Sequence, residues 1–153
     1  MKKITILSIG GVKEKYYQTA IAEYSKRLSK DVRLEFIELP AKSFSEKDSL
    51  IAKKQDSQRV LEFLNKNKNS QVFLLSENGE ELDSIQFSKK IFSFNEEIIF
   101  VIAGALGFDF DVLKDYKKLS LSKMTFLHEM AKVVLVEQIY RAVNIEKGKR
   151  YHY

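Results

Sequence analysis

The stretch Ile98-Ile99-Phe100-Val101-Ile102-Ala103-Gly104-Ala105-Leu106-Gly107 joins a continuous apolar run to a loop of small residues. An apolar run of this length, with no polar alternation, predicts a strand buried on both faces, as in a parallel sheet covered by helices. The loop after it has little side-chain bulk, so its backbone could bond a cofactor or could simply turn sharply. Its GxxG spacing is not the GxGxxG of a dinucleotide site, and no GxxxxGK[ST] occurs in the chain.

Similar short apolar runs recur along the chain and are separated by segments with helical periodicity. Strands are predicted over residues 4–9, 34–39, 72–76, 98–103 and 118–121. Helices are predicted between the first two strands, over residues 46–66, after a cap at Asp83, and over His128–Glu146. This alternation predicts an α/β fold with a mostly parallel sheet and helices on both of its faces.

Length and composition narrow the class of protein. The 153 residues suit one domain, 1–153, with a sizeable core, and no Pro/Gly/Ser-rich linker divides them. The longest apolar runs fall well short of the roughly 20 residues of a membrane-spanning helix, which predicts a soluble chain without membrane contact. The basic and then apolar start resembles a signal peptide, but Gly10-Gly11 and the charges after it interrupt the apolar run, so a first strand explains it better.

The chain has no cysteine and only two histidines, His128 and His152. These counts exclude disulfides, thiol nucleophiles and the usual structural zinc sites, and they predict that no metal is bound. A cytoplasmic location is expected for such a chain. The net charge of +5 is compatible with a phosphate-backbone partner, although many proteins with this balance bind no nucleic acid.

Two further segments have residues suited to ligand chemistry. Residues 119–128, LSLSKMTFLH, indicate a strand end, a polar loop and a helix start, with Thr125 as the candidate cap. As a ligand site, the same loop offers backbone amides and hydroxyls to an adenine edge and a ribose. The tail, KGKRYHY over residues 147–153, interleaves cations with aromatic rings, which suits stacking on bases and pairing with phosphates. A frayed terminus has the same composition.

Other charged and apolar patterns have simpler explanations. Glu137 and Arg141 stand four residues apart, which is typical of a surface salt bridge on a helix. Asp109 and Asp111 suggest paired carboxylates, and charges at the start of a helix are the simpler explanation. The helix His128–Glu146 is apolar on most sides, which predicts that it is buried in a core or against another subunit.

Four segments in this order and spacing resemble the RlmH family of ribosomal RNA large-subunit methyltransferases, within the SPOUT superfamily. They are EKY (14–16) with EYSKRL (23–28), FVIAGALG (100–107), LSLSKMT (119–125), and LVEQIYRA (135–142) leading to Tyr151-His152. The resemblance covers the whole chain and implies a single SPOUT domain with a trefoil knot in its C-terminal part, an exception to the no-knot rule. It further implies a homodimer that methylates N3 of a pseudouridine in the large-subunit RNA of the assembled ribosome.

The resemblance also implies S-adenosylmethionine as the methyl donor, with contacts in three loops. Carried over by position, these contacts fall on Leu75, Gly104, Ser122, Lys123, Met124, Thr125, Phe126 and Leu127. The chain departs from the family in having Ala103-Gly104 where paired glycines are usual, and Phe126-Leu127-His128 where Leu-Pro-His is usual. The missing proline would have stiffened the cofactor loop. In the tail, Arg150 replaces the usual proline and Tyr153 ends the chain in place of a basic residue.

The resemblance implies that three residues position the RNA base or take part in its reaction. Arg141 and the tail residues Tyr151 and His152, from this subunit or the other, position the base, and His152 accepts its proton at neutral pH. A non-catalytic RNA- or ribosome-binding protein is the alternative, which binding of S-adenosylmethionine would exclude. A Rossmann-type nucleotide enzyme is a third interpretation, disfavoured because Gly10-Gly11 after the first strand lacks the third glycine of that fingerprint.

Overall fold

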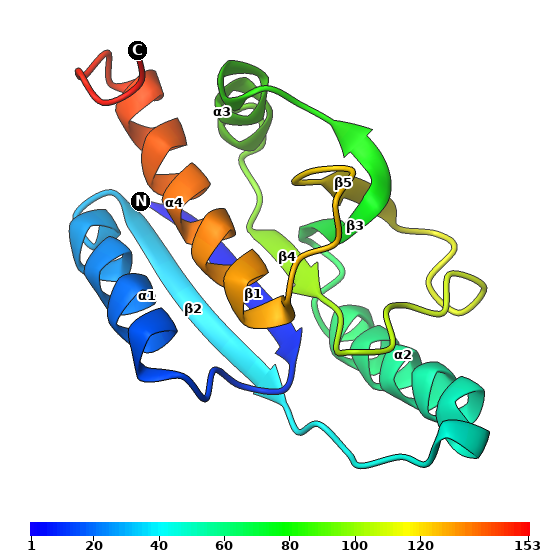
Figure 1. Ribbon diagram of the computed structural model, residues 1–153. Coiled ribbons are helices and arrows are strands. Elements are labelled where there is room, and N and C mark those ends of the chain that lie inside the picture. Colours follow the sequence, from blue (N-terminus) through cyan, green and yellow to red (C-terminus); the bar gives the residue numbers. More distant parts are fainter.

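The computed structural model describes residues 1–153, which form a five-stranded parallel sheet between two layers of helix (Figure 1). The strand order is β2-β1-β4-β3-β5, and every neighbouring pair is parallel. The elements run β1 (Lys2–Ile9), α1 (Lys15–Leu28), β2 (Val32–Leu39), η1 (Glu46–Asp48), α2 (Ser49–Asn65), β3 (Gln71–Glu81), α3 (Ser84–Phe92), β4 (Ile98–Ile102), β5 (Lys117–Ser120) and α4 (His128–Glu146). All five predicted strands and all four predicted helices are confirmed.

Strand β4, where the decisive apolar run lies, is near the middle of the sheet between β1 and β3. All five of its residues are buried. Ile98, Phe100 and Ile102 point into the larger apolar cluster, whereas Ile99 and Val101 point into the smaller one on the opposite face. The run shows no polar alternation because helices or loops cover both faces of this strand.

The two faces of the sheet are covered by different elements. Helices α1, α3 and α4 pack on one face through residues such as Ile21, Ile91 and Ile139 (Figure 1). Helix α2 covers the other face through Val60 and Leu64, together with the segment that follows β4. None of these helices combines the length and the apolar composition that crossing a bilayer requires.

The helix starts agree only in part with the sequence predictions. Asp83 caps α3 as expected: its carboxylate accepts from the Gln86 amide at 2.7 Å, and the Gln86 side chain accepts from the Asp83 amide at 2.9 Å. The prediction of Thr125 as the cap of α4 is wrong, because α4 is preceded by Leu127 and has no side-chain cap. A different set of contacts, around Lys132, holds the start of that helix.

Strand β3 is irregular where it pairs with β5. Leu119 of β5 pairs with both Leu75 and Glu80, so the residues between them leave the regular ladder. Gly79 lies in this stretch, and a Cβ atom placed on it would come within 2.6 Å of the Leu119 backbone. The close approach of the two backbones therefore requires glycine at this position.

We expect Gly79→Ala to destabilise the fold by about 1–3 kcal/mol, the range for forcing an extra methyl into a packed site. The methyl group would push β5 away from β3. Urea unfolding measures the effect, and Asn78→Ala at the exposed neighbouring position is the matched control. Equal stability of the two variants would show that the backbones can separate at no cost.

Candidate active site

The three predicted cofactor segments belong to three adjacent strands: two of them follow β4 and β5, and the third lies within β3. Leu75 is the last β3 residue before the irregular stretch, Gly104 follows β4, and residues 122–127 link β5 to α4. In a parallel sheet, ligands bind beyond the carboxyl ends of the strands, so all three segments lie in the expected region. No hydrogen bond joins the Gly104 loop directly to residues 122–127.

Gly104 begins a tight turn, in which the Gly107 amide donates to the Gly104 carbonyl at 3.1 Å. Gly107 has a φ of +77°, a conformation that other residues rarely adopt. A Cβ atom on Gly104 would lie 3.1 Å from Cγ2 of Ile9 at the end of β1. This side of the turn is therefore filled by β1, and a larger side chain at position 104 would have to displace Ile9 or the turn itself.

The loop over residues 122–127 is anchored at one end and exposed along most of its length. Ser120 donates to the Ser122 carbonyl at 2.8 Å, and the Ser122 hydroxyl accepts from the Met124 amide at 3.0 Å. Lys123, Met124, Thr125, Phe126 and Leu127 are all exposed. Their backbone groups and side chains are consequently accessible to a ligand or to a second protein surface.

A buried lysine, which the sequence analysis did not single out, fixes the start of α4. Lys132 is only 2% exposed, and its Nζ donates to the Ser8 hydroxyl at 3.1 Å and faces the Glu38 carboxylate at 3.5 Å. Burial lowers the pKa of Lys132 below its ordinary value, and Glu38 opposes this shift. The buried Glu129 accepts from the Lys13 amide. Together these contacts attach the first turns of α4 to the ends of β1 and β2.

The tail folds back on α4 of its own chain and forms a cluster around one carboxylate. Oε1 of Glu137 accepts from Nη2 of Arg141 at 2.7 Å and from the Tyr151 hydroxyl at 3.0 Å. Nη1 of Arg141 lies 3.2 Å from Nδ1 of His152. The Glu137–Arg141 salt bridge that the spacing predicts is therefore present, and it is also part of a network that holds the tail.

Tyr151 is held by its ring as well as by its hydroxyl group. Its ring lies edge-on to Tyr140 with 4.8 Å between centroids, and the Arg141 guanidinium lies 4.8 Å from the Tyr151 ring centroid. Burial raises the pKa of Tyr151 well above its ordinary value, and hydrogen bonds with Tyr24 and Glu137 raise it further. Tyr151 is therefore a neutral donor throughout the physiological range.

A cavity of about 420 Å³ lies between three parts of the chain. These are the start of α3, the end of β5 with the loop that follows it, and the middle of α4. Of the predicted site residues, only His152 lines it. Ser84 and Gln138, which the sequence analysis missed, supply polar groups on its wall, and the Ser84 hydroxyl donates to Oε1 of Gln138 at 2.8 Å. The remaining lining residues are Leu82, Asp83, Ile85, Phe87, Leu119, Ser120, Leu121 and Val134.

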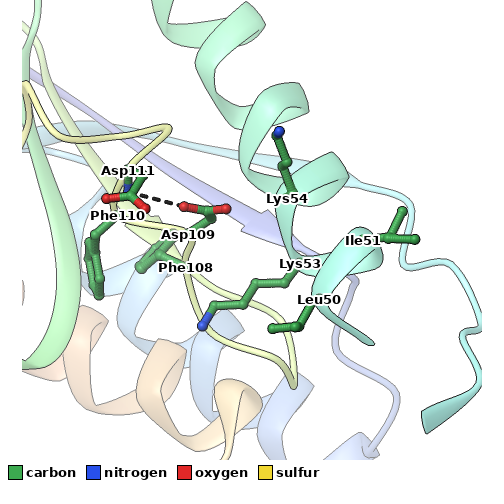
Figure 2. Close-up of a pocket in the computed structure, with 8 residues that line it drawn as sticks. All are labelled: Leu50, Ile51, Lys53, Lys54, Phe108, Asp109, Phe110 and Asp111. Atoms are coloured by element: carbon green, nitrogen blue, oxygen red, sulfur yellow. Dashed lines mark hydrogen bonds between the residues drawn. The ribbon is translucent and has the colours of Figure 1, made fainter. Parts of the chain in front are cut away.

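A second cavity, of about 500 Å³, lies between the start of α2 and the segment after β4, away from every predicted site residue (Figure 2). It is lined by Leu50, Ile51, Lys53, Lys54, Phe108, Asp109, Phe110 and Asp111. Asp109 and Asp111 do not start a helix as expected. Instead, the Asp109 carboxylate accepts from the Asp111 amide at 3.0 Å and so stabilises a turn.

We expect Glu137→Gln to cost about 1–3 kcal/mol of unfolding free energy, because a neutral amide replaces the charged acceptor of Arg141 and Tyr151. Glu146→Gln, at an exposed position on the same helix, is the matched control and should leave stability unchanged. Urea unfolding of both variants measures the difference. A Glu137→Gln protein as stable as the control would show that the network contributes little to folding.

The chain is similar to known proteins over nearly its whole length. A family model described as "Predicted SPOUT methyltransferase" matches residues 1–152. The chain is 43% identical to "Ribosomal RNA large subunit methyltransferase H 1" of Clostridium perfringens, covering 97% of this chain and 98% of the relative. It is 39% identical to "Ribosomal RNA large subunit methyltransferase H" of Enterococcus faecalis, covering 98% and 99% of the two chains.

The fold is shared with solved structures of much lower sequence identity. A candidate RNA methyltransferase from Bacillus anthracis superposes with a TM-score of 0.57 at 17% identity, over 99% of both chains. A probable methylase family protein from Haemophilus influenzae superposes with a TM-score of 0.60 at 11% identity, over 98% of this chain and 70% of that one.

Proposed function

Because the chain belongs to the SPOUT methyltransferase family, we propose that it transfers a methyl group from S-adenosylmethionine to N3 of a pseudouridine in large-subunit ribosomal RNA. The coarser activity, methylation of ribosomal RNA, follows from the family and from relatives at about 40% identity over nearly the full chain. The assembled ribosome is the expected substrate and the cytoplasm the expected location. Residues 1–153 are expected to form one SPOUT domain.

One observation supports the position of the site. The predicted cofactor segments lie within β3 or directly after β4 and β5, which are adjacent parallel strands, and the end of β5 opens onto the cavity that His152 lines. The small-residue turn at Gly104 and the exposed residues 123–127 suit a cofactor that is bound largely through main-chain groups. We assign Leu75, Gly104 and residues 122–127 to the cofactor and the cavity beside α4 to the RNA base.

The residues of this chain have distinct tasks in the proposed reaction. S-adenosylmethionine supplies a methyl group on a positively charged sulfur, which is already activated toward a nucleophile. The protein must align that methyl group with N3 of the base and exclude water. Apolar residues of the cavity cover the base faces, Ser84 and Gln138 offer polar groups to its edge, and Arg141, Tyr151 and His152 position it.

Mass spectrometry of large-subunit RNA from cells with and without the gene tests the proposed function. The proposal requires one methylated pseudouridine that disappears with the gene and returns when the gene is restored. Methyl transfer from labelled S-adenosylmethionine to ribosomes of the deletion strain, by the purified protein, tests the same reaction directly. Identical methylation in both strains would contradict the proposal.

We further propose a homodimer that uses the start of α4. The chain's own α1, α3 and sheet already bury Leu135, Val136 and Ile139, so most of α4 needs no partner. The exposed apolar residues gather instead before and at the start of the helix and on the neighbouring start of α1. These residues are Tyr16, Met124, Phe126, Leu127 and Met130.

Light scattering is expected to give twice the chain mass at micromolar concentration, because apolar residues grouped in this way favour burial against another surface. Leu127→Glu should shift the protein toward monomer, since it would bury a charge in the contact. Leu50→Glu, at another exposed apolar residue, on α2, is the matched control and should remain a dimer. A monomeric parent protein would refute the homodimer.

A further inference from the structure

His152 is held against α4 by a chain of hydrogen bonds that starts at a carboxylate. Arg141 donates through Nη2 to Glu137 at 2.7 Å, and its Nη1 lies 3.2 Å from Nδ1 of His152. A guanidinium has only donors and stays protonated in proteins. Nδ1 of His152 must therefore accept, so the imidazole in this arrangement is neutral and carries its proton on Nε2.

The protonated nitrogen remains available to a ligand. His152 lines the cavity assigned to the base, and its Nε2 makes no hydrogen bond within the chain. The charged and titratable groups around the ring are Arg141 and Glu137 on α4 and Tyr151 beside it in the tail. Asp83 of the same cavity is already occupied in capping α3.

We infer that His152 acts as a hydrogen-bond donor, whose Nε2–H binds a carbonyl oxygen of the target base. Arg141 and Glu137 position the ring and fix its tautomer. The inference rests on the proposed function. It gives His152 a different role from the proton acceptor that the sequence predicts.

Donation to a carbonyl oxygen suits the charge that develops on the base. The N3–H bond breaks first, and its proton goes to hydroxide from the solvent to give water. The negative charge that remains is shared between N3 and the two flanking carbonyl oxygens. The N3 lone pair then forms the bond to the methyl carbon, while the carbon–sulfur bond breaks and its electron pair stays on sulfur. A preorganised donor at a carbonyl oxygen stabilises this anion.

The same contact opposes the proton-acceptor role. A second proton on the ring would have to bind at Nδ1, where it would displace the hydrogen bond from Arg141. The product would be an imidazolium beside a guanidinium, and two like charges at this separation repel most strongly away from bulk water. Glu137 neutralises only one of these two charges.

The tautomer can be measured without any catalytic assay. In ¹⁵N-labelled full-length protein near neutral pH, the ring nitrogen shifts of His152 should show an unprotonated Nδ1 and a protonated Nε2. The chain has only two histidines, so His128→Gln assigns the signals. A protonated Nδ1 would overturn the inference, because Arg141 could not then donate to it.

The donor role is tested with two variants of His152 in methyl transfer to ribosomes. Removal of a donor that stabilises developing charge costs about 10²–10³-fold in kcat, so His152→Ala should fall by that factor. His152→Gln keeps an N–H near the position of Nε2 but cannot act as a base, and it should stay within about tenfold of the parent from about pH 6 to 9. A Gln variant as slow as the Ala variant, with both approaching the parent's rate as pH rises, would support a proton acceptor and overturn the inference.

Failure of the proposed function can be distinguished from failure of the donor role of His152. If the parent protein transfers no methyl group, the proposed function fails and the base-directed role of His152 fails with it, while the nitrogen shifts still decide the tautomer. If the parent is active and His152→Gln is not, the proposed function stands and only the donor role is lost.

Discussion

A protein that lacks residues 150–153 is expected to methylate ribosomes about 10²–10⁴-fold more slowly than the parent, while it still binds S-adenosylmethionine. The truncation removes His152 from the wall of the proposed base site and Tyr151 from the network beside it, but leaves Leu75, Gly104 and residues 122–127 in place. Single-turnover methyl transfer measures the rate, and calorimetry with S-adenosylmethionine measures the binding.

The truncation also costs some stability. It removes the Tyr151 hydrogen bond to Glu137, the contact between Arg141 and His152, and the contacts of the Tyr151 ring with Tyr140 and Arg141, together worth about 2–4 kcal/mol. Deletion of Tyr153 alone, which is 98% exposed, is the matched control and should keep the parental rate. If the four-residue truncation also keeps that rate, the tail is a frayed end and catalysis depends on other groups.

Gly104→Val is expected to weaken binding of S-adenosylmethionine by about 100-fold or more, which corresponds to roughly 2.7 kcal/mol. The first added carbon already meets Ile9 at 3.1 Å, so the branched side chain must displace Ile9 or the turn. We expect the turn to move, which takes its backbone out of the position from which it would bind the cofactor. Calorimetry measures the affinity, and circular dichroism establishes that the variant is folded.

Ala105→Val is the matched control for this substitution, because Ala105 is the exposed next residue of the same turn. It adds the same branched side chain to solvent and should bind the cofactor with an affinity close to that of the parent. Unchanged affinity in folded Gly104→Val would remove Gly104 from the cofactor site. Equal loss in both variants would show that the whole turn, and not the space at Gly104, decides binding.

The chain's local patterns determined its elements because each depends on neighbouring residues. The unbroken apolar run of β4 predicted burial on both faces, and both faces are covered. Asp83 and Gln86 predicted the start of α3, since a capping box needs only residues three apart. The start of α4 depends instead on contacts distant in sequence, those around Lys132. The local pattern predicted Thr125 as the cap of this helix, and that prediction was wrong.

The cofactor segments were assigned by position from the resemblance to the family. That assignment remains a prediction, which the binding measurements on Gly104→Val test. The trefoil knot and the pseudouridine target also remain predictions of that resemblance. The structure adds what no local pattern contains, namely that the three strands to which these segments belong are neighbours in one parallel sheet.

The sequence by itself determined the α/β fold class, the family, and the element boundaries to within a few residues, except that β3 continues past its predicted end at residue 76 to Glu81. Only the tertiary structure decided that Ser84 and Gln138, 54 residues apart, meet at 2.8 Å on the wall of one cavity, and that the tail returns to Glu137 and Arg141. The reason is physical. Periodicity and capping are set by interactions within a few residues of the chain, whereas the partners of a hydroxyl, a carboxylate or an imidazole are set by which elements the core packs together.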